Sequence, residues 1–470
     1  MLFITTAVVV LILVYHYGTR TFSYWAKRGV KHDPPIPYFG TAKRQFFQQI
    51  SHADIYDEMY EKYPNERFVG FYLTTTPTLI LRDPELVKRV LVSDFNHFYS
   101  RSVHPIDDAP EPLLNNLFSC EGDLWKLLRQ RLTPAFTSGK LRAMFPLIVS
   151  RAEKLQELAA ETASSGTDVD ARDLMARYTT DFIGACGFGI DTDTLSDENS
   201  MFRQIGRRMF KATTRDAVVF LLKFVMPGIF SSLHFLPEFV EKNMIDLVNK
   251  IMAQRNYKPS GRNDFIDMLL ELKDKGKIVG DSMTKKNPDG SACLTELDYM
   301  LHELAHHPEC QEKCQKEIDE VLARYDNKLC YDAVKEMKYL EMCFSETMRV
   351  FPPLGYLMRK CEKPYTISGT DVTLDPGVKV VIPVKSLHAD PQYWEEPEKF
   401  NPDRFHPDNV AKINKFAFLP FGEGPRNCIG KSFLTDFQKK EEVLNSMECF
   451  YYVHRLLEDY STDFNFFFVS

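Results

Sequence analysis

Residues 421–430 (FGEGPRNCIG) constrain the fold of this chain of 470 residues more than any other segment. They fit the pattern F-x-x-G-x-R-x-C-x-G, whose fixed residues coincide by chance on the order of once in ten thousand chains of this composition. Glycine adopts turns that other residues reach only at a cost, so its backbone can pass close to a flat cofactor. At a loop-to-helix junction, N–H donors and the helix dipole favour a cysteine thiolate. The motif therefore predicts that Cys428 ligates a metal ion.

Haem iron is the metal that suits Cys428, because Arg426 can pair with a haem propionate. A thiolate axial ligand pushes electron density onto the iron and favours cleavage of the dioxygen bond. The alternative is a buried structural cysteine beside a glycine-rich turn, and the complete spacing of the motif argues against it. The sequence thus predicts oxygen chemistry on a haem that Cys428 ligates.

Two upstream segments extend the pattern. Residues 346–349 (ETMR) fit E-x-x-R, and residues 401–405 (NPDRF) contain P-[ED]-R-F. With these motifs the chain resembles a cytochrome P450 of the microsomal, reductase-fed type, and its insect xenobiotic-metabolising members in particular, from the N-terminus to Ser432. The resemblance implies a network of Glu346, Arg349 and Arg404 beneath the haem.

The E-x-x-R pair also has an ordinary interpretation. Residues three positions apart on a helix can form a surface ion pair that contributes only a few tenths of a kcal/mol. Apolar neighbours such as Leu340 and Phe344, and the abrupt stop at residues 351–353 (FPP), favour a buried pair instead. We therefore expect Glu346 and Arg349 inside the protein.

The resemblance also implies further haem-binding residues. Residues 125–129 (WKLLR) fit W-x-x-x-R, which places the Trp125 indole N–H and the Arg129 guanidinium on one helix face, within reach of a propionate. Arg359 matches the family's other propionate arginine, with a solvated surface residue as the alternative. Together with Arg426 and Cys428, these residues form the predicted cofactor-binding set, and Cys428 is its metal ligand.

Hydrophobic periodicity predicts a mainly α fold with small β-sheets. The strongest helical patterns cover residues 84–92, 123–132, 141–160, 201–211, 237–254, 265–273, 301–322 and 339–350. Residues 68–72 and 78–81 are β-type runs that read as a hairpin, and a second β-rich patch extends from residue 365 to 384. The resemblance implies that these elements form a P450-type fold.

The first 40 residues predict an attachment to a membrane. Residues 2–17 form one apolar run, and residues 1–19 are predicted to be a retained membrane anchor. A cleaved signal peptide is the alternative, but no charged segment precedes the run. The cations that follow put the body of the protein on the cytosolic side. Prolines in residues 20–40 predict a stiff connector. The haem-binding domain is then expected over residues 41–470.

Overall charge and cysteine content exclude several classes of protein. The formal net charge is −7 and no basic stripe is present, which argues against a nucleic-acid partner. The ten cysteines show no dense framework of the small secreted kind, so we expect most of them to be reduced and buried. His306, Cys310 and Cys314 at helical spacing could offer a metal site, but a fourth ligand is lacking, and residues at the boundary of an amphipathic helix are the favoured interpretation.

The chain departs from the family at the distal side of the haem. There the family carries [AG]-G-x-[DE]-T on one long helix, whereas the matching text here stops at Asp298 and resumes at Met300. Much of this central distal helix is therefore expected to be missing. Thr295 lacks the preceding acid, so the distal role is not assigned to it, and the catalytic residues stay unknown. Residues 431–470 form a tail unlike that of the family.

These observations predict a haem-thiolate monooxygenase that uses NADPH and dioxygen to oxidise lipophilic small molecules. The resemblance implies haem b as cofactor, NADPH-cytochrome P450 reductase as partner, and the endoplasmic reticulum membrane as location. The first alternative is a catalytically impaired haem-binding variant that lacks the distal motif. The second is a membrane-tethered scaffold that binds no haem.

Overall fold

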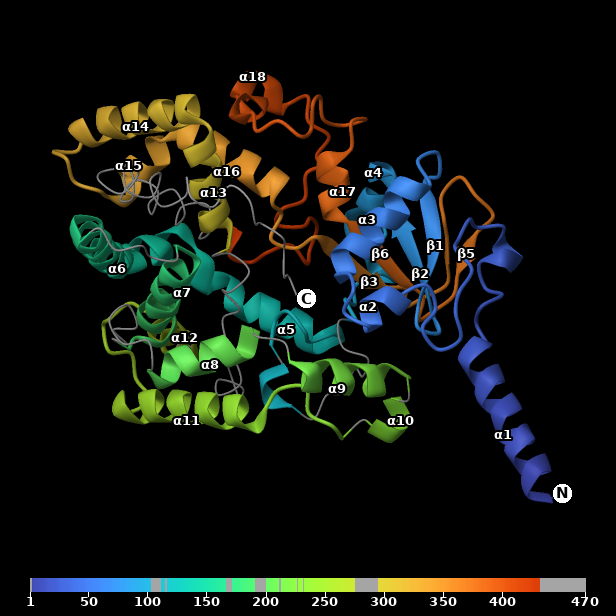
Figure 1. Ribbon diagram of the computed structural model, residues 1–470. Coiled ribbons are helices and arrows are strands. Elements are labelled where there is room, and N and C mark those ends of the chain that lie inside the picture. The colour runs from blue at the N-terminus through green and yellow to red at the C-terminus, as the bar shows by residue number, and fades with distance from the viewer. Residues whose placement is uncertain are drawn as a thin grey trace.

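A four-stranded sheet and a larger group of helices make up the protein (Figure 1). The computed structural model describes residues 2–102, 111–114, 116–165, 171–190, 200–210, 213–225, 227–230, 232–274 and 295–431. Helices far outnumber strands along this part of the chain, so the prediction of a mainly α fold with small sheets is confirmed.

The sheet joins two distant parts of the sequence. Strands β1 (Phe68–Leu73) and β2 (Thr76–Leu81) pair antiparallel, as the predicted hairpin requires, with Phe68 opposite Leu81. Strand β6 (Lys379–Pro383) then lies parallel to β2, and β3 (Tyr356–Lys360) pairs antiparallel with β6, in the order β1-β2-β6-β3. The short strands β4 (Tyr365–Thr366) and β5 (Thr373–Leu374) form a second sheet. Strand β3 had no sequence prediction.

Most predicted helices are present with small changes at their ends. The helices are α1 (Leu2–Thr19), α2 (Lys43–Phe46), α3 (His52–Lys62), α4 (Pro84–Lys88), α5 (Gly122–Leu132), α6 (Ser138–Ser165), α7 (Ala171–Phe182), α8 (Met201–Phe210), α9 (Thr214–Val225), α10 (Pro227–Phe230), α11 (Glu238–Gln254), α12 (Phe265–Asp274), α13 (Thr295–His306), α14 (Pro308–Ala323), α15 (Tyr331–Glu336), α16 (Lys338–Val350), α17 (Val384–Ala389) and α18 (Pro407–Val410). The largest apolar core lies between α6, α7, α13, α14 and α16. Helix α17 contacts both α16 and α3, so it bridges the helical part and the sheet (Figure 1).

One helix prediction was wrong. Residues 301–322 were expected as a single helix, but α13 ends at His306 and α14 starts at Pro308. Proline has no backbone N–H and its ring clashes with the preceding turn, so it begins a helix more readily than it continues one. His306 therefore does not share a helix with Cys310 and Cys314, and among the described residues these three do not gather as a possible metal site.

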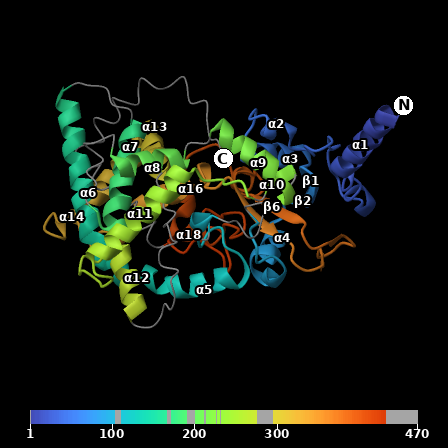
Figure 2. The same cartoon turned by 90° about the horizontal axis from the view of Figure 1, so that it is seen from below.

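The N-terminal helix α1 projects away from the rest of the molecule (Figures 1 and 2). Its bounds agree with the predicted apolar run. In the described part of the chain, no helix combines the length and the apolarity that a membrane crossing requires.

Residues after α1 pack closely on the sheet. Trp25 is fully buried, and its Nε1–H donates to the Phe71 carbonyl oxygen at 2.9 Å. A Cβ atom at Gly70 would lie 2.6 Å from the Trp25 ring, so the glycine makes room for the indole. The segment of residues 20–40 thus contributes to the core around β1, a contact that its prolines did not predict.

Two expectations fall outside the described residues. The stretch in which the distal helix was expected to be shortened includes residues 275–294, and the atypical tail extends over residues 432–470.

Candidate functional site

The loop around Cys428 has the backbone that its glycines predict. Gly422 and Gly424 have φ angles of 63° and 79°, which favour glycine. A Cβ atom at Gly424 would lie 1.9 Å from the Leu91 carbonyl oxygen, so no other residue fits there. The Cys428 N–H donates to the Phe421 carbonyl oxygen at 2.9 Å, which closes the loop. Cys428 is half-buried at the end of this turn.

Arg426 is enclosed beside this loop. Its Nη1 lies 2.5 Å from Glu121 Oε2 and donates to the Tyr99 carbonyl oxygen at 2.8 Å. Its guanidinium carbon lies 4.8 Å from the ring centroid of Trp125, which is itself buried. The buried Nε of Arg426 has no hydrogen-bond partner among the described residues. This cation therefore has a donor left over for a bound group.

Helix α5 docks on the cysteine loop through Arg129. Its Nη1 donates to the Asn427 carbonyl oxygen at 2.8 Å and its Nη2 to Asn427 Oδ1 at 2.7 Å. Burial lowers the pKa of Arg129, while the nearby Cys428 opposes that shift. Trp125, one turn earlier, lies on the same side of α5, as the W-x-x-x-R spacing predicted. The structure thus brings both residues to Cys428 and Arg426.

Arg359 is completely buried on β3, and the alternative of a solvated side chain is wrong. Its Nη1 donates to the Met358 carbonyl oxygen, but its buried Nε has no partner in the described part of the chain. Burial, then repulsion from Arg101 and Arg426, hold its pKa well below the usual value. A buried guanidinium in this situation requires a nearby anion.

Arg101 is a fourth cation that the sequence analysis missed. Its Nη2 donates to the Arg426 carbonyl oxygen at 3.0 Å. Burial and the neighbouring Arg426 lower the pKa of Arg101 to about 10, against the opposing effects of Glu121 and Cys428. A bridge between Ser100 and Lys360 brings this residue beside β3. Since the bridge joins segments far apart in sequence, no local pattern could have revealed it.

The arginines define the chemistry that this site accepts. We call the guanidiniums of Arg101, Arg129, Arg359 and Arg426 the arginine cluster. Among the described residues, Glu121 is the carboxylate that contacts it, and this group already accepts backbone N–H bonds from Arg101 and Ser102. The cluster therefore carries excess positive charge, and two of its members, Arg359 and Arg426, are buried. A haem with two propionates and a thiolate-ligated iron fits this donor set.

In the Glu346 network, each arginine contacts the same buried carboxylate. Arg349 donates from Nε and Nη2 to the two Glu346 oxygens, each at 2.8 Å, and both residues are buried. Arg404 Nε lies 3.3 Å from Glu346 Oε1, and the Asn401 N–H donates to the same oxygen at 2.9 Å. The three residues named by the E-x-x-R and P-[ED]-R-F patterns thus meet, and the surface-pair alternative is wrong.

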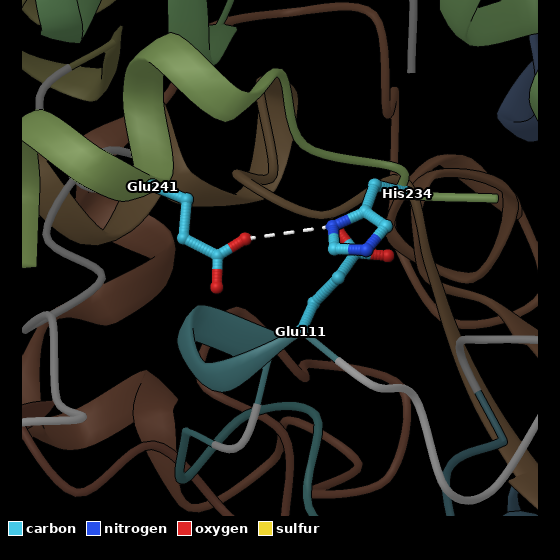
Figure 3. Close-up of side chains that lie close together, drawn as sticks. All are labelled: Glu111, His234 and Glu241. Carbon is cyan, nitrogen blue, oxygen red and sulfur yellow. Dashed lines mark ion pairs between the residues drawn. The ribbon is translucent and has the colours of Figure 1, made fainter. Parts of the chain in front are cut away.

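A second cluster of ionisable groups lies near the start of α11. Figure 3 shows Glu111, His234 and Glu241 close together, with His234 Nδ1 3.7 Å from Glu241 Oε2. The Glu111 oxygens accept backbone N–H bonds from Phe235 and Leu236, and the buried Lys223 ammonium lies 3.6 Å away. Because an ammonium already neutralises Glu111, this arrangement disfavours a bound cation. We assign no metal to it.

Comparison with known proteins identifies the class. The family described as "Cytochrome P450" matches residues 31–435, which is most of the chain, so this protein belongs to the cytochrome P450 family. It is a haem-thiolate monooxygenase that receives electrons from NADPH through a reductase. The family implies a redox partner and lipophilic substrates.

The relatives with curated names are insect proteins. Cytochrome P450 6B2 of Helicoverpa armigera is 35% identical over 446 residues, which cover 90% of this chain and 87% of the relative. Probable cytochrome P450 6a13 of Drosophila melanogaster is 37% identical, and the match covers 88% of this chain and 85% of the relative. Cytochrome P450 6B1 of Papilio polyxenes is 34% identical, and the match covers 92% of this chain and 90% of the relative. The resemblance to insect P450s is confirmed, and these matches give no support to the impaired-variant alternative.

Proposed function

We propose that Cys428 is the axial ligand of the haem iron and that the arginine cluster, with Trp125, holds the propionates. The observation that carries this proposal is the excess of guanidiniums in the arginine cluster, where Arg359 and Arg426 are buried and keep an Nε without a partner among the described residues. Two propionates would supply the missing anions at hydrogen-bonding distance. Such charge-assisted bonds are roughly twice as strong as neutral ones.

Each element of the site has a defined task in this proposal. A thiolate-ligated haem supplies the activation of dioxygen. Gly422 and Gly424 let the loop approach the cofactor closely, and the Cys428 N–H bond to Phe421 holds the thiol in one place. Arg129 ties α5 to the loop through Asn427, so the propionate-binding helix and the ligand move as one unit. Glu346, Arg349 and Arg404 would support this arrangement on the side of the haem that Cys428 occupies.

The finer features of location and partners belong to the same proposal. Residues 1–19 would anchor the chain in the endoplasmic reticulum membrane, with residues 41–470 in the cytosol and NADPH-cytochrome P450 reductase as electron donor. In support, α1 is apolar and projects away from the domain (Figure 2). The Tyr38 hydroxyl donates to the Val14 carbonyl oxygen, which links the connector to this helix. The substrates would be lipophilic small molecules.

A substitution of the ligand tests the proposal. The full chain and its C428S variant would be produced with haem, reduced and exposed to carbon monoxide. We expect the strongly red-shifted Soret band of a thiolate-ligated haem in the parent and its loss in C428S. C330S changes another described cysteine and serves as the control that keeps the band. A red-shifted band in C428S would overturn the assignment.

Turnover provides the second part of this test. The parent chain, mixed with a P450 reductase and NADPH in vesicles, should convert a lipophilic probe to an oxidised product, whereas C428S should not. A parent protein that binds haem with the thiolate band but forms no product under these conditions would support the impaired variant instead.

A further inference from the structure

A buried histidine connects the Glu346 network to the cysteine loop. His388 lies on α17 and is buried. Its carbonyl oxygen accepts a hydrogen bond from Arg349 Nη1 at 2.9 Å, and its Nδ1 lies 3.1 Å from the Arg349 carbonyl oxygen. Its Nε2 lies 2.8 Å from the backbone nitrogen of Leu419. One side chain therefore bonds α16 and the segment that leads to Cys428.

The partners of the ring define its protonation state. The Arg349 carbonyl oxygen can only accept, so His388 Nδ1 carries the proton and donates it. The Leu419 N–H can only donate, so Nε2 is unprotonated and accepts. Burial, and the nearby Arg349 charge, lower the pKa of His388 to about 3, in agreement with this neutral tautomer. Each ring nitrogen therefore has a hydrogen-bond partner. The opposite tautomer would lose both hydrogen bonds.

The bond to Leu419 acts on the loop that carries the thiolate. The Leu419 carbonyl oxygen accepts the Gly422 N–H at 3.0 Å, which starts the turn. The Phe421 carbonyl oxygen, inside that turn, accepts the Cys428 N–H at 2.9 Å. His388 therefore holds the first residue of the turn whose last bond orients Cys428. The neighbouring Phe418 ring, 5.3 Å from the imidazole, closes this contact from one side.

We propose that His388 is a positioning residue: through the Leu419 N–H bond it transmits the rigidity of the Glu346 network to the Cys428 loop and keeps the thiolate on the haem iron. This inference rests on the proposed function, because it requires Cys428 to be the ligand. A purely structural histidine would stabilise the fold without any effect on the form of iron ligation.

Three substitutions of His388 distinguish the contribution of the Nδ1 hydrogen bond from that of the Nε2 hydrogen bond. In H388Q the amide oxygen can reach the position of Nε2 and accept from Leu419, while in H388N the shorter amide can replace only Nδ1. H388L fills space and makes neither bond. W394F is the matched control, because the buried Trp394 Nε1 donates to the carbonyl oxygen of Leu387, the residue before His388 on α17, at 3.0 Å and not to Leu419.

The readouts are the ferrous carbon monoxide spectrum over time and hydrogen exchange of the loop. We expect H388N and H388L, but not H388Q or W394F, to convert from the thiolate band to an unshifted band at least about tenfold faster than the parent, since a buried N–H loses its partner. Exchange at the Leu419 amide should accelerate by a similar factor in the same two variants. Thermal unfolding in parallel identifies any variant that fails to fold.

The outcomes distinguish this inference from the proposed function. If H388N and H388L retain the thiolate band as long as W394F does, the positioning role is wrong, while the loss of the band in C428S would still support the haem ligand. If C428S retains the band, the proposed function itself fails. If H388Q loses the band as fast as H388L, the bond to Leu419 is not the element that acts.

Discussion

Two buried groups of arginines lie in this protein, and they differ in how their charges are balanced. In the Glu346 network, the carboxylate receives both arginines and a backbone N–H. The arginine cluster contains four guanidiniums and contacts one described carboxylate, Glu121, and two of its Nε atoms have no partner among the described residues. A paired network supports a fold on its own, whereas an unpaired one prepares a place for an anionic ligand.

The largest expected effect breaks the paired network. E346Q removes the charge that Arg349 and Arg404 share, so two guanidiniums stay buried without a counter-ion. The free energy of unfolding should fall by about 3–5 kcal/mol, the usual result of removing one partner from a buried ion pair. Urea unfolding measures it.

The control for E346Q is E58Q, at the exposed pair of Arg44 and Glu58. A surface ion pair contributes about 0.2–1 kcal/mol, so the free energy of unfolding of E58Q should lie close to that of the parent. Equal effects of the two substitutions would contradict the distinction between a buried network and the surface.

A substitution in the arginine cluster should act in the opposite direction. R359M removes a cation that repels Arg101 and Arg426, so the haem-free protein should be as stable as the parent or more stable. Bound haem should dissociate about tenfold to a hundredfold faster, because a charge-assisted bond of about 1.5–3 kcal/mol is lost. Transfer of haem to an excess of another haem-binding protein gives the rate.

R67M, at the exposed pair of Arg67 and Asp83, is the corresponding control and should leave haem dissociation unchanged. If R359M instead destabilises the haem-free protein as strongly as E346Q does, then Arg359 belongs to the structural support and not to the cofactor site.

A pH change of one unit should have a smaller effect than either substitution. The pKa of His388 falls from 6.5 to about 3 on folding, so below pH 6.5 the unfolded chain binds a proton that the folded protein excludes. Stability should therefore decrease as the pH falls from 6.5 toward 3, by up to about 1.4 kcal/mol per pH unit from this residue. H388Q, which cannot titrate, should lose that part of the slope in urea unfolding measured at several pH values.

Other groups, including His52 and Asp57, also contribute to the pH dependence of stability in this range. His52, with a pKa lowered to about 4 by burial, adds a slope of the same sign, and Asp57, with a pKa raised to about 6 by burial, adds one of opposite sign between pH 3.8 and 6. The comparison of H388Q with the parent removes both contributions, since they are common to the two proteins. Identical slopes in the two proteins would show that folding does not change the pKa of His388.

Short-range patterns predicted those parts of the site whose residues lie on one element. Trp125 and Arg129 follow from one helix turn, and Glu346 and Arg349 from another. The break at Pro308 was missed although the proline itself is a local signal, because the apolar periodicity on both sides was given more weight. Arg101 and His388 carry no such signal, since their partners lie on other elements: Arg426 is 325 residues from Arg101, and Arg349 and Leu419 are 39 and 31 residues from His388.

The sequence by itself determined the family, the ligand loop and the mainly α composition, because each depends on residue types at fixed short spacings. Only the tertiary structure decided that β2 pairs with β6, that four arginines meet beside Cys428, and that His388 links Arg349 to Leu419. The physical reason is that burial and charge balance depend on contacts between distant segments, which periodicity along the chain does not encode.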